Sequence, residues 1–281
     1  MSRKFRIIKE ELYRAFVNRW MVFAIIIGCI ISLMQIAASQ SLIKGIENVY
    51  SNGGDNIYAA KVAYTFTIWD GWIGTNICSF QRLLFFIMPL VSAMIYSGSY
   101  ASDMKGYINN ICTRVGRQDY ILAKNIAVFV SGGLVAVIPL ILNMLLWMML
   151  LPTSMPNPID GALSINDLVV FSALFYEAPY IYCIIYIIYV FIFYGLLSCM
   201  GIVISMWDSN SFVVRVFPFI AFYALHTVTS YLGFSKCSPI QLIIMPIMIK
   251  KYAYVMAIIM LIMAVMIALT IVMHKKRDML K

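Results

Sequence analysis

The sequence predicts an all-α polytopic membrane protein with six membrane-spanning helices. Of its 281 residues, 63% are hydrophobic and only 12% are charged, whereas soluble domains average about 25% charged residues. Apolar runs recur six times, each long enough to cross a bilayer as a helix of roughly 20 residues. We therefore expect one transmembrane domain over residues 1–281, with spans near 20–38, 83–101, 125–151, 180–206, 212–232 and 252–273.

The distribution of basic residues predicts the orientation of these spans. With both termini in the cytoplasm, fifteen lysines and arginines lie in inner segments and six in outer segments. Cytoplasmic segments of membrane proteins carry such an excess. The sequence therefore predicts a multi-pass plasma-membrane protein, of bacterial type, with both termini inside. Topology accounts for the net charge of +9, so we expect the lipid bilayer as a partner and no nucleic acid.

Residues 1–19 have the pattern of an amphipathic helix lying in the membrane interface. Its predicted apolar stripe consists of Phe5, Ile8, Leu12, Ala15 and Phe16. Five basic residues surround this stripe: Arg3, Lys4, Arg6, Lys9 and Arg14. The apolar run that follows is too long for a typical signal-peptide core, so we expect an uncleaved first span.

The longest inner polar break, residues 103–124, has helical periodicity at its centre. Ile108, Ile111, Cys112 and Val115 fall at i, i+3, i+4 and i+7, on one face of a short helix. Gly116 follows as a natural stop. A short amphipathic helix is therefore predicted between spans two and three, where it could receive force from a cytoplasmic partner.

Two outer segments have unusual composition. Residues 69–72 (WDGW) suggest an aromatic patch at the membrane interface. Residues 240–249 are apolar but too short to cross a bilayer, and Pro239 and Pro246 interrupt them. We expect this second segment to form a re-entrant or interfacial helix pair before span six.

No motif for ATP chemistry is present, because nothing fits GxxxxGK[ST]. Residues 131–134 (SGGL) lie inside span three, where small residues allow helices to pack closely. No pair of the six cysteines has CxxC or metal-ligand spacing. We expect free cysteines, although one pair among Cys78, Cys183 and Cys237 stays open.

Three polar residues in or beside the spans are candidates for a substrate path: His226, Asn143 and Glu177. An ionisable group inside a span is a functional candidate by default. The alternatives for His226 are a hydrogen bond to a neighbouring helix or a position that reaches the outer interface. The alternative for Glu177 is a solvated cap.

Fragments of the sequence loosely resemble the pattern of intramembrane proteases, namely Glu10, Glu11, Arg14, Phe222, His226, His274 and Asp278. The glutamates and His274 are predicted at the inner ends of the spans. His226 would lie about 21 Å from the inner end of its span, at about 1.5 Å per helical residue. These groups could not share one metal or water, so a protease is the least favoured class.

The residues Asp103, Gly106, the Gly116–Arg117 turn, Tyr120 and Lys124, together with the six-span layout, resemble an ABC-2 type transporter permease. Tyr107 departs from that family's outline, which has threonine there. Val115–Gly116 also replaces a common proline-containing turn. The resemblance covers the whole chain as a layout and only this short stretch as sequence.

The resemblance implies a transport subunit rather than an enzyme. A separate cytoplasmic ATPase would bind ATP and Mg²⁺, so no cofactor is expected in this chain. A second permease subunit, identical or paralogous, would complete the path. Coupling to the ATPase would involve Asp103, Gly106, Ile108, Ile111, Cys112, Val115, Arg117 and Lys124. The expected cargo is a hydrophobic or cationic peptide such as a bacteriocin, a lipid or a drug, moved outward. A secondary transporter or channel is the alternative.

Overall fold

The computed structural model describes residues 3–51, 66–104, 106, 108, 115–156 and 165–279. These residues fold almost entirely into helices. The α-helices are α1 Arg3–Phe16, α2 Arg19–Ser51, α4 Ile68–Gly71, α5 Ser79–Tyr96, α6 Ser99–Asp103, α8 Arg117–Leu150, α9 Ser172–Glu177, α10 Pro179–Ile204, α11 Ser211–Tyr231, α12 Pro239–Ile243 and α13 Ala253–Met279. Short 3₁₀ turns occur at η1 Ser235–Cys237, η2 Met245–Ile247 and η3 Lys250–Tyr252.

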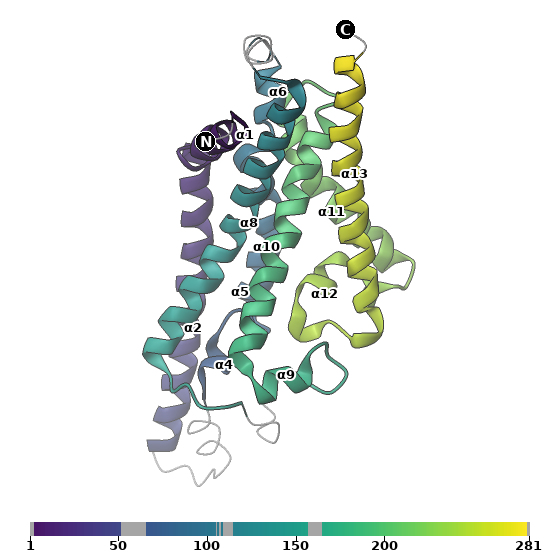
Figure 1. The fold of residues 1–281 in the computed structure, drawn as a ribbon. Coiled ribbons are helices and arrows are strands. Elements are labelled where there is room, and N and C mark those ends of the chain that lie inside the picture. The colour runs from purple at the N-terminus through teal and green to yellow at the C-terminus, as the bar shows by residue number, and fades with distance from the viewer. Residues whose placement is uncertain are drawn as a thin grey trace.

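Six of these segments are long and apolar enough to cross a membrane, which confirms the predicted all-helical class with six candidate spans. They are α2, α5 with α6, α8, α10, α11 and α13. In Figure 1 the long helices run side by side, and both termini lie at the same end of the bundle. This arrangement is what an even number of crossings produces. The bundle end that holds the termini is called the terminal end below.

The α8 helix begins earlier than the predicted third span. Its first residue is Arg117, whereas the apolar run begins at Asn125. The first two turns of α8, residues 117–124, are polar in sequence but pack one face into the protein. Tyr120, Ile121 and Lys124 are all buried on that face. Hydropathy marks the start of the apolar run and therefore misses these turns.

Glycines allow α8 and α10 to pack closely at the centre of the bundle. A Cβ atom at Gly133 would lie 2.7 Å from the carbonyl oxygen of Phe191, and one at Gly195 would lie 2.9 Å from that of Phe129. Both distances are shorter than a real Cβ contact. The interpretation of residues 131–134 as a helix-packing motif is therefore confirmed.

We expect Gly133→Ala to destabilise the bundle by about 1–3 kcal/mol, the usual cost of overpacking. The added methyl group meets the backbone of α10, which cannot move aside as a flexible side chain could. Gly116→Ala is the matched control, because nothing lies within 4 Å of a Cβ atom there. Denaturant unfolding of the purified variants measures both effects. Equal stability of the two variants would contradict the packing argument.

The loop segment 66–78 folds inside the bundle instead of lying on its surface. Trp69 and Trp72 are each only 1% exposed. The Trp72 ring contacts Tyr186 of α10 edge-on, with 6.0 Å between ring centroids. The prediction of an interfacial aromatic patch is wrong in this respect, since the indoles face protein. Buried aromatic and interfacial aromatic residues have the same local sequence.

The segment before α13 also folds back against the helices. Leu242, Ile243 and Met245 are each at most 1% exposed. The Tyr189 hydroxyl of α10 donates to the Leu242 carbonyl at 2.7 Å. At the end of the segment next to α13, Ile249 forms an antiparallel β-bridge with Val169. In Figure 1, α12 lies between the bundle and α13 in the half away from the termini.

The predicted short helix of the inner polar break falls largely outside the described residues. Asp103 ends α6 and is buried. Ile108 is 7% exposed and joins a core cluster that includes Ala15 of α1 and Tyr120 of α8. The described parts of the break are thus attached to α1 and α8.

Candidate functional site

A buried ionic cluster joins three elements at the terminal end of the bundle. The ammonium group of Lys124, on α8, is fully buried. It donates to Glu11 Oε2 of α1 at 2.8 Å and to Asp103 Oδ2 of α6 at 2.6 Å. Glu11 is 113 residues from Lys124 in sequence, so this contact fixes the tertiary position of α1.

Two tyrosines complete the surroundings of the ammonium group. The Tyr96 hydroxyl donates to Glu11 Oε2 at 2.7 Å, and the Tyr120 hydroxyl donates to Asp103 Oδ2 at 2.5 Å. The ammonium nitrogen of Lys124 lies 4.7 Å from the Tyr96 ring centroid and 5.4 Å from that of Tyr120. Aromatic faces attract a cation at such distances.

Arg14 lies on the solvent-exposed side of the cluster and bonds both carboxylates. Its guanidinium donates to Glu11 Oε1 at 2.8 Å and to Asp103 Oδ1 at 3.2 Å. Burial opposes the charge on Arg14, but the neighbouring Glu11 and Asp103 carboxylates raise its pKa above the ordinary value. With Lys124, the four groups form two cations and two anions, so the buried site is electrically balanced.

One face of α1 packs against the rest of the protein, and the predicted apolar stripe lies only partly on that face. Ile7, Glu11 and Ala15 face the protein and are at most 9% exposed. Phe5 and Phe16, assigned to the predicted apolar stripe, are 54% and 39% exposed. Glu11 lies on the buried face because its carboxylate bonds Lys124 and Tyr96, which a pattern of apolar residues cannot indicate. Ile8 and Leu12 of the predicted stripe are half-buried.

The other described residues that are predicted to couple to a partner lie close to Asp103 or to the start of α8 along the chain. Gly106 has a φ of 157° just after α6, which a residue with a side chain would adopt only under strain. Val115 is half-buried, and Arg117 begins α8. Ile111 and Cys112 lie outside the described residues. Sequence reasoning identified Asp103 and Lys124 but missed Glu11, which it grouped with the protease-like fragments.

The three candidates for a substrate path lie in separate places. Nδ1 of His226 hydrogen-bonds the hydroxyl of Ser238 beside α12, as one of the two alternatives expected for it. Glu177 is exposed at the end of α9. Asn143 is fully buried in α8. Their roles in transport stay predictions.

Asn143 belongs to a second polar cluster, which holds the 66–78 segment in place. Its Oδ1 accepts the Ile73 N–H at 2.9 Å, and its Nδ2 donates to Gln35 Oε1 of α2 at 2.9 Å. Gln35 in turn donates to the Gly71 carbonyl at 2.7 Å and accepts from Trp147 Nε1 at 3.1 Å. These bonds satisfy backbone groups that the segment would otherwise bury unpaired.

The protease-like fragments do not converge. Both carboxylate oxygens of Glu11 are bonded within the ionic cluster. His226 lies on α11 next to the segment that leads into α12, in the half of the bundle away from the termini (Figure 1). Among the described residues, no group of three or more His, Cys, Asp or Glu side chains is placed to hold a metal ion.

The cysteines with described positions, Cys29, Cys78, Cys183, Cys199 and Cys237, are free. The pairing left open among Cys78, Cys183 and Cys237 is therefore absent from this part of the chain. Comparison with known proteins adds no assignment: no family model, no curated protein and no solved structure matches the chain.

Proposed function

We propose that this protein is the transmembrane permease subunit of an ATP-driven exporter of the ABC-2 type, with ATP hydrolysed by a separate cytoplasmic subunit. The six candidate spans and the termini at one end support the proposal. So does the amphipathic α1, which lies against α8 at the same end. In this proposal the terminal end faces the cytoplasm of a bacterial cell.

The observation that carries the proposal is the buried contact of Lys124 with Glu11 and Asp103. Asp103 ends α6 and is the first residue of the break that is predicted to meet the ATPase. A displacement of that break would act on Asp103, and from there on α1 and α8 through buried ion pairs. Separating the partners of a buried pair leaves a buried charge uncompensated, which costs free energy. The partners therefore move together more readily than those of an exposed pair.

The position of the charged cluster also distinguishes the proposal from its alternative. An ion-coupled secondary transporter commonly carries ionisable groups near the middle of the membrane. In the described part of this chain, the buried ion pairs lie at the terminal end. The polar cluster around Asn143 is uncharged and serves the packing of the 66–78 segment.

For the cargo we propose a hydrophobic or amphipathic molecule, such as a peptide, a lipid or a drug. A cavity among α10, α11 and α13 is lined by apolar residues, which supports an apolar cargo. A second subunit of the same kind would cover part of the apolar surface of α11 and α13. In each of these two helices, only 17% of the residues in an 18-residue apolar window are buried.

The test is co-purification of an ATPase subunit with the tagged protein in mild detergent. We expect Val115→Asp to reduce recovery of that subunit several-fold, because a carboxylate would disrupt the apolar face of the break. Leu168→Asp is the matched control, since Leu168 is 66% exposed beside α9 at the other end of the bundle. Equal recovery with both variants would remove the break from the ATPase interface. If no ATPase subunit is recovered with the unmodified protein, the proposal fails.

A further inference from the structure

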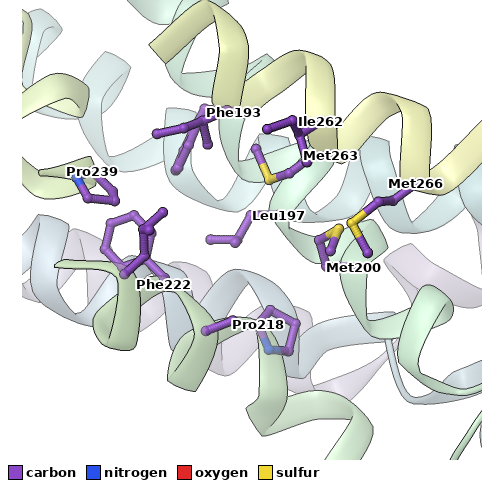
Figure 2. A pocket seen from close by; sticks show the side chains of 12 residues that line it. Phe193, Leu197, Met200, Pro218, Phe222, Pro239, Ile262, Met263 and Met266 are labelled. Atoms are coloured by element: carbon purple, nitrogen blue, oxygen red, sulfur yellow. The ribbon is translucent and has the colours of Figure 1, made fainter. Parts of the chain in front are cut away.

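An apolar chamber lies among α10, α11, α13 and the start of α12. Figure 2 shows side chains of all four elements directed into it, among them Phe193, Leu197, Phe222, Pro239 and Met263. Its volume is about 180 Å³, and apolar residues alone line it. A dry apolar cavity of about 150 Å³ is large enough to hold benzene. The chamber can therefore hold a stretch of hydrocarbon and is unsuited to water.

The chamber can be entered from outside the bundle. Leu225 of α11 and Ile262 of α13 both line it, and they are 41% and 53% exposed. Met200, Met263 and Met266 form part of the wall. Methionine side chains are flexible and adapt to irregular ligands. A chain entering between α11 and α13 would thus meet an adaptable apolar surface.

A polar hollow lies next to the chamber, at the end of α11. Its volume is about 260 Å³, and its lining includes Lys236, Cys237 and Tyr252. The Lys251 ammonium lies 5.9 Å from the Tyr252 ring centroid, beside the same hollow. From residue 209 to residue 277 the sequence contains no aspartate or glutamate. Lys236 and Lys251 therefore have no acidic residue close to them along the chain.

One residue separates the two hollows. Cys237 lines the polar hollow, Pro239 lines the chamber, and the buried Ser238 lies between them. Ser238 is bonded to Nδ1 of His226, one helical turn beyond Phe222 of the chamber wall. The second ring nitrogen of His226 has no hydrogen-bond partner among the described residues. A polar group at the boundary could therefore bind His226, while the attached chain enters the chamber.

We propose that the two hollows bind one single-chain anionic amphiphile, such as a fatty acid. The hydrocarbon tail occupies the chamber, where burial of apolar surface stabilises it. The carboxylate lies beside His226 and toward Lys236 and Lys251, where charge-assisted hydrogen bonds favour it. The site binds its ligand with or without an ATPase partner, so the inference goes beyond the proposed function and does not depend on it.

Photolabelling of the purified full-length protein in phosphatidylcholine nanodiscs tests the site, with a diazirine-bearing palmitate as the probe. We expect labelled peptides from α11 and α13. Excess palmitate should reduce labelling by at least about fivefold, because it competes with the probe for the same site. Hexadecanol and phosphatidylglycerol should compete much less. Equal competition by hexadecanol would overturn the role of the carboxylate, and equal competition by phosphatidylglycerol would overturn the single-chain assignment.

Matched variants test each hollow separately. Ala221→Trp fills the chamber and should lower labelling at least about fivefold, whereas Ala268→Trp, on an exposed position of α13 outside the lining, should not. Leu225→Trp serves if Ala221→Trp fails to fold. The double variant Lys236→Gln, Lys251→Gln should weaken palmitate labelling but leave labelling by a diazirine-bearing hexadecanol unchanged. Wild-type labelling in a folded chamber variant would overturn the proposal, whether or not an ATPase subunit is found.

Discussion

Replacing Lys124 by alanine is expected to lower the free energy of unfolding by about 3–5 kcal/mol, as when one partner of a buried ion pair is removed. The substitution leaves the Glu11 and Asp103 carboxylates close together, both buried and with Arg14 as their remaining cation. It also removes the cation that lies over the rings of Tyr96 and Tyr120. Denaturant titration of the purified protein in detergent measures the loss.

Two comparisons show whether the buried charges cause this effect. Lys4→Ala also removes a lysine from an ion pair, here with Asp119, but Lys4 is 69% exposed. Exposed pairs contribute about 0–1 kcal/mol, so this control should be nearly neutral. The triple variant Lys124→Met, Glu11→Gln, Asp103→Asn should recover part of the loss, because it leaves no fully buried charge unpaired. Arg14 loses both carboxylate partners, but its side chain is 37% exposed. A Lys124→Ala protein as stable as the Lys4→Ala protein would refute the ionic cluster.

Gln35→Leu is expected to destabilise the protein by about 2–6 kcal/mol. The amide of Gln35 bonds the Gly71 carbonyl and the Trp147 indole N–H, and both partners are buried. Leucine has a similar size but cannot bond either group, and each buried group left unpaired costs about 1–3 kcal/mol. We also expect faster proteolysis within residues 66–78, because the segment loses its attachment to α2. Unfolding in denaturant and limited proteolysis measure the two effects.

Gln40→Leu is the control for that experiment. Gln40 lies on the same helix, is half-buried, and has no hydrogen-bond partner among the described residues. The same change of side chain should therefore alter stability by no more than about 0.5 kcal/mol. Similar losses in both variants would mean that any polar-to-apolar change in this part of α2 is harmful. The specific role of Gln35 would then be wrong.

The six candidate spans could be predicted from the sequence because each depends on a local property, an apolar run of sufficient length. The packing role of Gly132 and Gly133 was predictable for a similar reason, since small residues within a span have few other uses. Asp103 and Lys124 were identified as a pair of interest only through a resemblance. Their direct contact across 21 residues is a feature of the fold.

The features that the sequence did not reveal depend on contacts between distant segments. Glu11 is one of two adjacent glutamates on an amphipathic helix, and only the position of Lys124 determines which of them is buried. Likewise, the tryptophans of residues 69–72 are buried because Gln35 and Asn143 bond the neighbouring backbone. Periodicity within a window of residues contains no information about such partners.

The buried 66–78 segment has a consequence for how the protein is made. The Trp72 indole bonds the Leu140 carbonyl, and the Ile73 N–H bonds Asn143, which are 68 and 70 residues further along the chain. A ribosome adding about 5–20 residues per second needs roughly 4–14 s to supply those partners. During that interval the indole N–H groups of Trp69 and Trp72 and the backbone N–H of Ile73 lack the partners that they have in the folded protein. The half of the bundle away from the termini can therefore close around this segment only after α8 has been synthesised.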